Sequence, residues 1–338
     1  MLRLSVLDQS TIVEGRDPAS SIRESVALAR HAEALGYARY WCAEHHASPG
    51  QAGSAPEILI AAIAAATNCI RVGSAGVMLP HYASLKVAEQ FRVLESLAPG
   101  RIDLGLGRAP GSDSRTARAL NPFADQAVEH FPAQIRDLLA WITDSPLVEG
   151  HPSRGIICQP VCTTVPEVWI LGSSDYGAEV AAYFGLPFCF AAFITDGAGI
   201  ERAMEVYRAN YRASVRHPTP YAAICVWAIA AETNEEAVRQ VASRALLRLW
   251  RDQGRFAALP SPETAATEVS LLNNPSRERY EYHRAMAIHG TGEQVAAALK
   301  MLASKHSLSE ISVLSTLHNP NLRQHSYTLL AQSFGLKI

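Results

Sequence analysis

The sequence lacks an excess of charge of either sign. Its 30 lysine and arginine residues nearly balance 32 aspartate and glutamate residues, so the formal net charge is −2 at pH 7. No run of basic residues stands out. Proteins that bind nucleic acid or an anionic membrane surface generally need a basic patch to do so. The charge balance therefore argues against both kinds of partner.

Long hydrophobic runs are also missing. The longest apolar run, Ile58 to Ala66, is far shorter than the roughly 18 residues that a membrane span needs. The first residues reach Asp8 too soon to contain the apolar core of a secretory signal. We therefore expect neither a membrane-spanning segment nor a signal peptide.

Cysteine is scarce, and its spacing does not predict a metal site. Of six cysteines, four lie in apolar or strand-like runs, as buried thiols do. Cys158 and Cys162 have no matching second pair, so a zinc site is not expected. We interpret all six as reduced thiols of a cytoplasmic protein.

The chain does have an ordinary globular composition, with 48% apolar and 18% charged residues. No repeat, linker or low-complexity segment divides it. Length alone suggests about two domains, but α/β barrels of about 250 residues plus insertions remain single. We predict one domain over residues 1–338.

Strand-like and helix-like segments alternate along the chain. The predicted strands are Leu2–Asp8, Tyr40–Ala43, Ile70–Gly76, Arg101–Gly107, Val168–Leu171, Pro187–Ala191, Ala222–Ala231 and Ile311–Leu314. The predicted helices lie at 20–35, 56–67, 84–97, within 125–143, and at 176–184, 200–212, 234–250, 291–303 and 322–334. Eight β/α units predict an α/β fold that closes into a TIM barrel. An open doubly wound sheet is the alternative.

Two segments interrupt this alternation and are predicted as insertions. Residues 145–166 are rich in proline and glycine, and residues 255–289 have weak periodicity and several turn-forming residues. Insertions this long in a compact barrel are usually functional or disordered. Because the second follows a barrel strand and its helix, we predict a mobile lid at the C-terminal face of the barrel.

Glu44, His45 and His46 leave the end of the second predicted strand together and are candidate catalytic residues. Such strand ends are where α/β enzymes keep their chemistry, and histidine changes charge near neutral pH. Alternatively, one histidine caps the strand and the other packs. Adjacent residues of a strand point to opposite sides, so this pair is poorly placed to bind one metal ion.

Small residues and one arginine follow the next two strands. Ala75 and Gly76 permit either tight strand packing or the close approach of a flat ring. The segment Gly105–Gly107 precedes Arg108, whose guanidinium we expect to point into the barrel mouth. Pro110 stands where a dinucleotide-binding motif has its third glycine, so that motif is rejected.

Gly172, Ser173 and Ser174 follow the fifth strand and precede a helix. Free backbone N–H groups at a helix N-terminus bind phosphate, although ordinary capping by either serine is the alternative. An arginine fork beside such a terminus suits a phosphate ester, and the small residues leave room for a planar ring. These features fit a phosphate-bearing ring cofactor such as FMN.

Four segments resemble the bacterial luciferase-like flavin monooxygenase family. They are Ala43–His46, Ile70–Pro80, Val87–Phe91 running on to Pro99–Arg108, and Leu171–Ser174. The resemblance covers most of the chain. It implies a luciferase-like barrel with an insertion that binds reduced FMN as a co-substrate, and a separate flavin reductase that supplies this FMN.

The resemblance also implies roles for single residues. His45 matches the catalytic histidine near the reactive carbon of the flavin, and Arg108 matches the arginine on the flavin phosphate. Ser173 and Ser174 match the phosphate-binding turn. Ala75-Gly76 matches a peptide beneath the flavin ring that is often cis.

The chain departs from the family at two positions. Gly107 replaces a cysteine of luciferase, and Phe193 replaces a histidine that many relatives carry. The substrate and light emission are therefore not implied by the resemblance.

The resemblance implies a monooxygenase in which reduced FMN and O₂ form a C4a-hydroperoxide that oxygenates a small organic substrate, such as an aldehyde or another carbonyl compound. His45 would be the acid or base. The alternatives are a non-catalytic flavin-binding relative, a deazaflavin-dependent oxidoreductase and a metal-dependent barrel hydrolase.

The uncharged helix Ile58–Ala66 predicts a homodimer, because an outer helix that is apolar all round needs cover on both sides. Cover by the chain's own insertion is the alternative.

Overall fold

A computed structural model describes residues 2–108 and 112–337, so Pro110 lies outside the described residues. All strand pairings in the described part are parallel. The strands are β1 (Arg3–Asp8), β2 (Arg39–Cys42), β3 (Arg71–Met78), β4 (Ile102–Gly107), β5 (Glu167–Gly172), β6 (Phe188–Ala191), β7 (Ala222–Ala231), β8 (Ile288–Thr291) and β9 (Glu310–Leu314).

Eight of these strands close into a barrel. Neighbouring strands pair in the order β1, β2, β3, β4, β5, β6, β7 and β9, and β9 pairs back with β1. Because a closed ring has no sheet edge, the open-sheet alternative is wrong and the predicted TIM barrel is confirmed. All eight predicted strands belong to the ring, and β8 is an additional strand that pairs only with the last residues of β7 within the described part.

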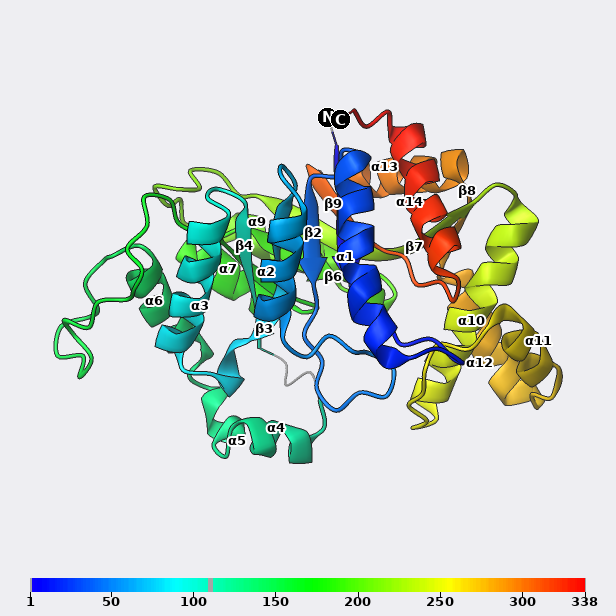
Figure 1. The fold of residues 1–338 in the computed structure, drawn as a ribbon, viewed down its shortest axis with the longest axis horizontal. Helices are drawn as coiled ribbons and strands as arrows, with labels where there is room; N and C mark the ends of the chain where they lie inside the picture. Colours follow the sequence, from blue (N-terminus) through cyan, green and yellow to red (C-terminus); the bar gives the residue numbers. More distant parts are fainter. Residues whose placement is uncertain (1, 109–111, 338) are drawn as a thin grey trace.

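Helices surround the barrel (Figure 1). They are α1 (Pro18–Ala34), α2 (Pro56–Ala66), α3 (Ser84–Leu97), α4 (Ser114–Leu120), α5 (Ala124–Ala127), α6 (Phe131–Ile142), α7 (Asp175–Phe184), α8 (Ala192–Thr195), α9 (Ile200–Ala209), α10 (Asn234–Asp252), α11 (Pro262–Ser270), α12 (Asn274–Ala285), α13 (Gly292–Lys305) and α14 (Pro320–Phe334), with a 3₁₀ turn η1 at Leu79–His81. Among the described residues, none of these helices has the length and apolar character required to cross a membrane.

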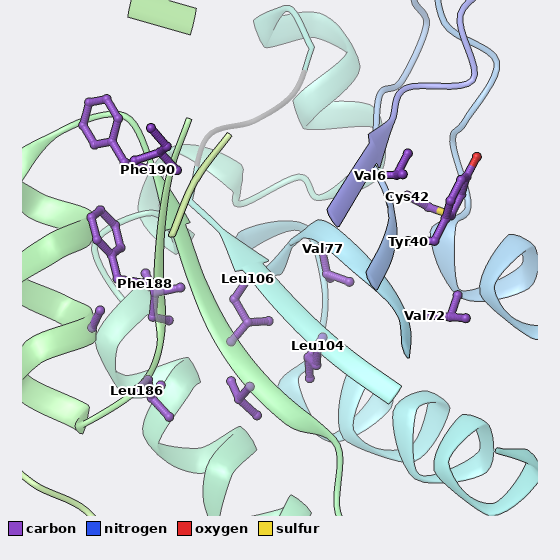
Figure 2. Packing of buried hydrophobic residues seen from close by; sticks show 14 of the residues in the cluster. Val6, Tyr40, Cys42, Val72, Val77, Leu104, Leu106, Leu186, Phe188 and Phe190 are labelled. Carbon is purple, nitrogen blue, oxygen red and sulfur yellow. The ribbon is translucent and has the colours of Figure 1, made fainter. Parts of the chain in front are cut away.

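Side chains alternate between two apolar clusters along each barrel strand. On β7, the odd-numbered residues from Ala223 to Ile229 fill the barrel, whereas the even-numbered residues pack outward against the helices. Figure 2 shows part of the outer cluster, in which Phe188 and Phe190 point to the same side of β6. Burial on both faces explains why β7 is apolar throughout.

Buried charges fill the N-terminal end of the barrel. Nη1 of Arg39 donates to Asp103 and to Glu167, each at 2.8 Å, and its Nε donates to Glu310 at 3.1 Å. Nε1 of Trp41 also donates to Asp103, at 2.9 Å. Such burial is tolerated when each charge is paired and hydrogen-bonded. The network closes this end of the barrel, which leaves the C-terminal end for a ligand site.

The segment 255–289 is more ordered than the sequence predicted. It contains α11 and α12, which pack against α10, and it runs into β8. Both helices are short, but each has a regular N-cap, because Ser261 accepts from Thr264 and Asn273 accepts from Ser276. The sequence periodicity of residues 255–289 is weak because α11 and α12 each have a narrow apolar face. Movement of this segment as a lid stays a prediction.

The segment 145–166 contains neither helix nor strand in the structure. Arg92, which is fully buried, holds both of its ends. It donates to Asp144 at 2.7 and 2.8 Å, and its Nε donates to the carbonyl of Pro160 at 2.7 Å. This segment leaves the outer face of α2 uncovered, because Ile58 is 69% exposed.

We expect the protein to form a homodimer through α2. Ala62 and Ala65 are exposed beside Ile58, so the outward face is apolar and allows close packing by a second helix. Light scattering at micromolar concentration should give the dimer mass. Ala62→Glu should shift the mass towards the monomer, whereas Met301→Lys, at a 73% exposed apolar residue on α13, should not. A monomeric wild-type protein would contradict this expectation.

Candidate active site at the barrel mouth

Glu44 and His46 form a hydrogen-bonded pair at the end of β2. Oε1 of Glu44 accepts from the hydroxyl of Tyr82 at 2.7 Å and shares a 2.7 Å hydrogen bond with Nε2 of His46. Oε2 of Glu44 accepts from the backbone N–H of Met78 at 3.1 Å. The Glu44 carboxylate is buried, and these contacts join the ends of β2 and β3. These hydrogen bonds indicate that Glu44 and His46 have a structural role.

His45 stands between these two residues in the sequence and takes no part in their hydrogen bond. Its backbone N–H donates to the carbonyl of Gly53 at 2.9 Å. Its Nδ1 is buried and has no hydrogen-bond partner among the described residues. The pKa of His45 is lowered to about 4, chiefly by burial and in addition by the nearby Arg251, against the opposing effect of Glu44. The imidazole is therefore neutral at pH 7, with one donor and one acceptor nitrogen.

The Ala75–Gly76 peptide bond is cis, and the β3–β4 register shifts at this point. A Cβ at Gly76 would lie 2.7 Å from Cδ1 of Leu171 and 2.8 Å from the carbonyl oxygen of Gly105. Tight strand packing therefore accounts for Gly76. Ala75 is partly exposed and packs against the barrel interior, so it is the small residue that faces the mouth.

Arg108 lies beside the N-terminus of α7. Its Cζ is 4.0 Å from the ring centroid of Tyr176, in the first turn of that helix. Ser174 is the N-cap, yet its side chain makes no capping hydrogen bond. Nε of Arg202 lies 3.7 Å from the carboxylate of Asp175. An exposed arginine and a helix N-terminus without a side-chain cap thus adjoin, which favours an anion.

The structure places the predicted site residues on four consecutive strands. Glu44, His45 and His46 follow β2, Ala75 and Gly76 lie in β3, Arg108 follows β4, and Gly172, Ser173 and Ser174 end or follow β5.

The sequence did not reveal one face of α10 that borders the same mouth. Arg248 lies one turn after Arg244, and it donates to Oδ2 of Asp196 at 3.0 Å and to the carbonyl of Phe193 at 3.1 Å. Phe193 packs against the barrel interior. The spacing of Arg244, Arg248 and Arg251 on one helical face was the available signal.

Glu44 and His46 are hydrogen-bonded to each other, whereas Nδ1 of His45 has no hydrogen-bond partner among the described residues. Within residues 2–108 and 112–337, no group of three or more His, Cys, Asp or Glu side chains is arranged to bind a metal. The geometry gives the metal-dependent hydrolase alternative no support.

Comparison with known proteins points to one family. The model of the luciferase-like monooxygenases matches residues 2–305. A luciferase-like monooxygenase of Escherichia coli (strain K12) is 37% identical, over 97% of this chain and 96% of the relative. The N-acetyl-S-alkylcysteine monooxygenase of Bacillus subtilis (strain 168) is 36% identical, over 98% of each chain.

Solved structures support the same fold. Apo-MsnO8 matches with a TM-score of 0.91 at 38% identity, over 100% of this chain and 99% of that one. The oxygenating constituent of 3,6-diketocamphane monooxygenase from Pseudomonas putida, in complex with FMN, has a TM-score of 0.73 at 17% identity, over 98% and 97%. An F420-dependent secondary alcohol dehydrogenase has a TM-score of 0.58 at 12% identity, over 100% and 99%. The last two share the fold and bind different cofactors.

The lowered pKa of His45 predicts a pH-dependent stability. The unfolded chain binds a proton at this residue near its ordinary pKa of 6.5, whereas the folded chain does so only near 4. His45 therefore weakens the fold progressively as the pH falls through this window. The urea-unfolding free energy should fall less steeply for His45→Asn than for wild type between about pH 6.5 and pH 4.5. Parallel pH profiles would contradict the burial of a neutral imidazole.

Proposed function

Because the chain belongs to the luciferase-like monooxygenase family, we propose that it is the oxygenase of a two-component flavin monooxygenase. It would use reduced FMN and O₂, through a C4a-hydroperoxide, to oxygenate a small organic substrate. A separate flavin reductase would deliver the reduced FMN. The observation that carries this proposal is the position of Arg108 beside the α7 N-terminus, on the same barrel mouth as His45, whose Nδ1 has no hydrogen-bond partner among the described residues.

The residues present fit FMN. Arg108 and the backbone N–H groups after Ser174 offer donors and positive charge to a phosphate monoester. Ala75 is a small, partly exposed residue of β3, which lies between the strands that precede His45 and Arg108, so it would permit the close approach of a flat ring. Bound FMN would supply the redox chemistry with oxygen, and the protein would supply orientation and protons.

His45 is the residue best placed to hold or move a proton. It is neutral at pH 7 because burial lowers its pKa to about 4, so it can accept a hydrogen bond at one nitrogen and donate at the other. Its Nδ1 has no partner among the described residues. Glu44 and His46 support it indirectly, because their hydrogen bonds position the end of β2.

The relatives suggest which substrates to test. One relative is an N-acetyl-S-alkylcysteine monooxygenase, so N-acetylated thioethers join the aldehydes that the family resemblance implies. The test is a reductase-coupled assay that measures oxygen consumed, hydrogen peroxide released and oxygenated product. A substrate should increase product at the expense of peroxide. If no compound changes the peroxide yield, a non-catalytic flavin binder is favoured. If reduced F420 is oxidised without O₂, the deazaflavin alternative is favoured.

We expect Arg108→Ala to weaken FMN binding by about ten- to a hundredfold. Losing a charged, bidentate contact costs about 1.5–3 kcal/mol, and each decade of affinity corresponds to about 1.4 kcal/mol. Riboflavin lacks the phosphate, so its affinity should stay nearly unchanged. Fluorescence titration with both ligands measures this, with Arg154→Ala in the exposed segment 145–166 as the control. Equal losses for FMN and riboflavin would rule out a phosphate contact.

We expect His45→Ala to keep FMN affinity within a few-fold and to shift oxygen use from product to hydrogen peroxide. The reason is that the imidazole, whose Nδ1 has no partner among the described residues, would be the proton donor or acceptor for the reacting oxygen. The reductase-coupled assay gives the ratio of product to peroxide. His46→Ala removes the hydrogen bond to Glu44 and should mainly lower thermal stability. An unchanged ratio in His45→Ala would remove His45 from the chemistry.

A further inference from the structure

Arg244 is a partly buried arginine that forms no ion pair with an acidic residue in the described part of the chain. It lies in the middle of α10, and its Cζ is 3.9 Å from the ring centroid of Trp227. Trp227 belongs to the interior face of β7, near the C-terminal end of the barrel. Among the described residues, no hydrogen bond or ion pair to the Arg244 guanidinium is present. Helix α10 thus presents an unpaired cation at the barrel mouth.

The nearby acid is already occupied. Asp196 pairs with Arg248 at 3.0 Å, and Arg248 also donates to the carbonyl of Phe193. The pKa of Arg244 is lowered to about 9, chiefly by burial and in addition by Arg248 and Arg251, against the opposing effect of Asp196. Cations that leave water are normally paired with an anion. The protein provides no such partner for Arg244 among the described residues.

Trp227, whose ring stacks against Arg244, carries a second hydrogen-bond donor. Nε1 of Trp227 is buried without a hydrogen-bond partner in the described part of the chain, and Trp227 is only 6% exposed. Indole and guanidinium groups can donate hydrogen bonds but cannot accept them. Two adjacent groups with free donors suit a ligand group that only accepts. The indole ring covers one face of the guanidinium, so its in-plane N–H groups remain for a planar acceptor.

We propose that Arg244, stacked on Trp227, binds the carboxylate of an anionic organic substrate at the barrel mouth. This inference rests on the proposed function, because it assigns a substrate class to the same mouth. A carboxylate is planar and matches the arginine fork with two parallel hydrogen bonds. Phe193, Leu171 and Ala75 pack partly buried at the rim of the barrel interior, so the rest of the substrate would be apolar.

The position of Arg244 separates the substrate site from the cofactor site. Arg108 follows β4, whereas Arg244 lies over β7, and β5 and β6 stand between these two strands in the barrel. One arginine is thus available for the cofactor phosphate and another for the substrate. His45, after β2, belongs to the same ring of strand ends. Arg244 is therefore a binding residue for the substrate and has no contact role toward the phosphate.

Calorimetric titration of matched acid and amide probes tests this inference without turnover. The probes are 4-phenylbutanoate with 4-phenylbutanamide, and hexanoate with hexanamide, each titrated into the wild-type protein with and without FMN. We expect at least one acid to bind about ten- to a hundredfold more tightly than its amide. Arg244→Gln should abolish this preference and leave amide affinity unchanged. Arg244→Lys should retain part of it, because lysine keeps the charge but loses the fork.

The control is Arg251→Gln, which removes an exposed positive charge from the same helical face and should keep the preference for the acid. FMN affinity should be equal in wild type and Arg244→Gln. Equal binding of acid and amide, no binding of either acid at millimolar concentration, or a preference that survives in Arg244→Gln would overturn the inference. Failure of the proposed function would look different: the acid preference would remain while FMN binding or oxygen turnover was absent.

Discussion

The buried ion network around Arg39 fixes the arrangement on which the rest of the barrel depends. Arg39 begins β2 and binds carboxylates from three other strands, Asp103, Glu167 and Glu310. Removing one partner would leave a buried charge unpaired, so the network holds the strands in one register. Side chains then alternate from this fixed start. Trp41 and Ala43 point inward, whereas Tyr40 and Cys42 pack outward. We expect the same alternation to bring His45 to the inner side and to turn Glu44 and His46 away from it.

Different strand ends at the barrel mouth carry residues that suit different ligands. The β4 and β5 ends carry Arg108 and the open N-terminus of α7, which suit a phosphate. The end of β2 carries a neutral imidazole, and the β7 side carries Arg244 on helix α10. A reaction between a bound cofactor, oxygen and a third molecule needs such separation, because each component must be oriented independently before the chemistry begins.

Periodicity was sufficient to predict the barrel, because the barrel strands are buried on both faces and most of the covering helices, α2 excepted, have one apolar stripe. The strand-end rule selected His45 and Arg108 as candidates; the structure places both after barrel strands, and their roles stay predictions. The sequence did not reveal the network of Arg39, because charged residues at strand starts resemble surface residues until closure brings them together. It also did not predict α11 and α12, whose apolar faces are narrow, or Arg244, whose contact with Trp227 is a tertiary one. Gly76 was open to two readings, and only the packed neighbours decided between them.

We propose that the barrel mouth holds reduced FMN during its reaction with oxygen. The direct measurement is a rapid-mixing experiment in which the protein, loaded anaerobically with reduced FMN, meets oxygenated buffer while flavin absorbance is recorded. We predict that the absorbance of oxidised flavin appears after a delay, in a phase slower than for free reduced FMN, because the site shields the reacting flavin from water. Reoxidation in a single phase that is indistinguishable from that of free FMN, at a protein concentration that binds the cofactor, would contradict the account.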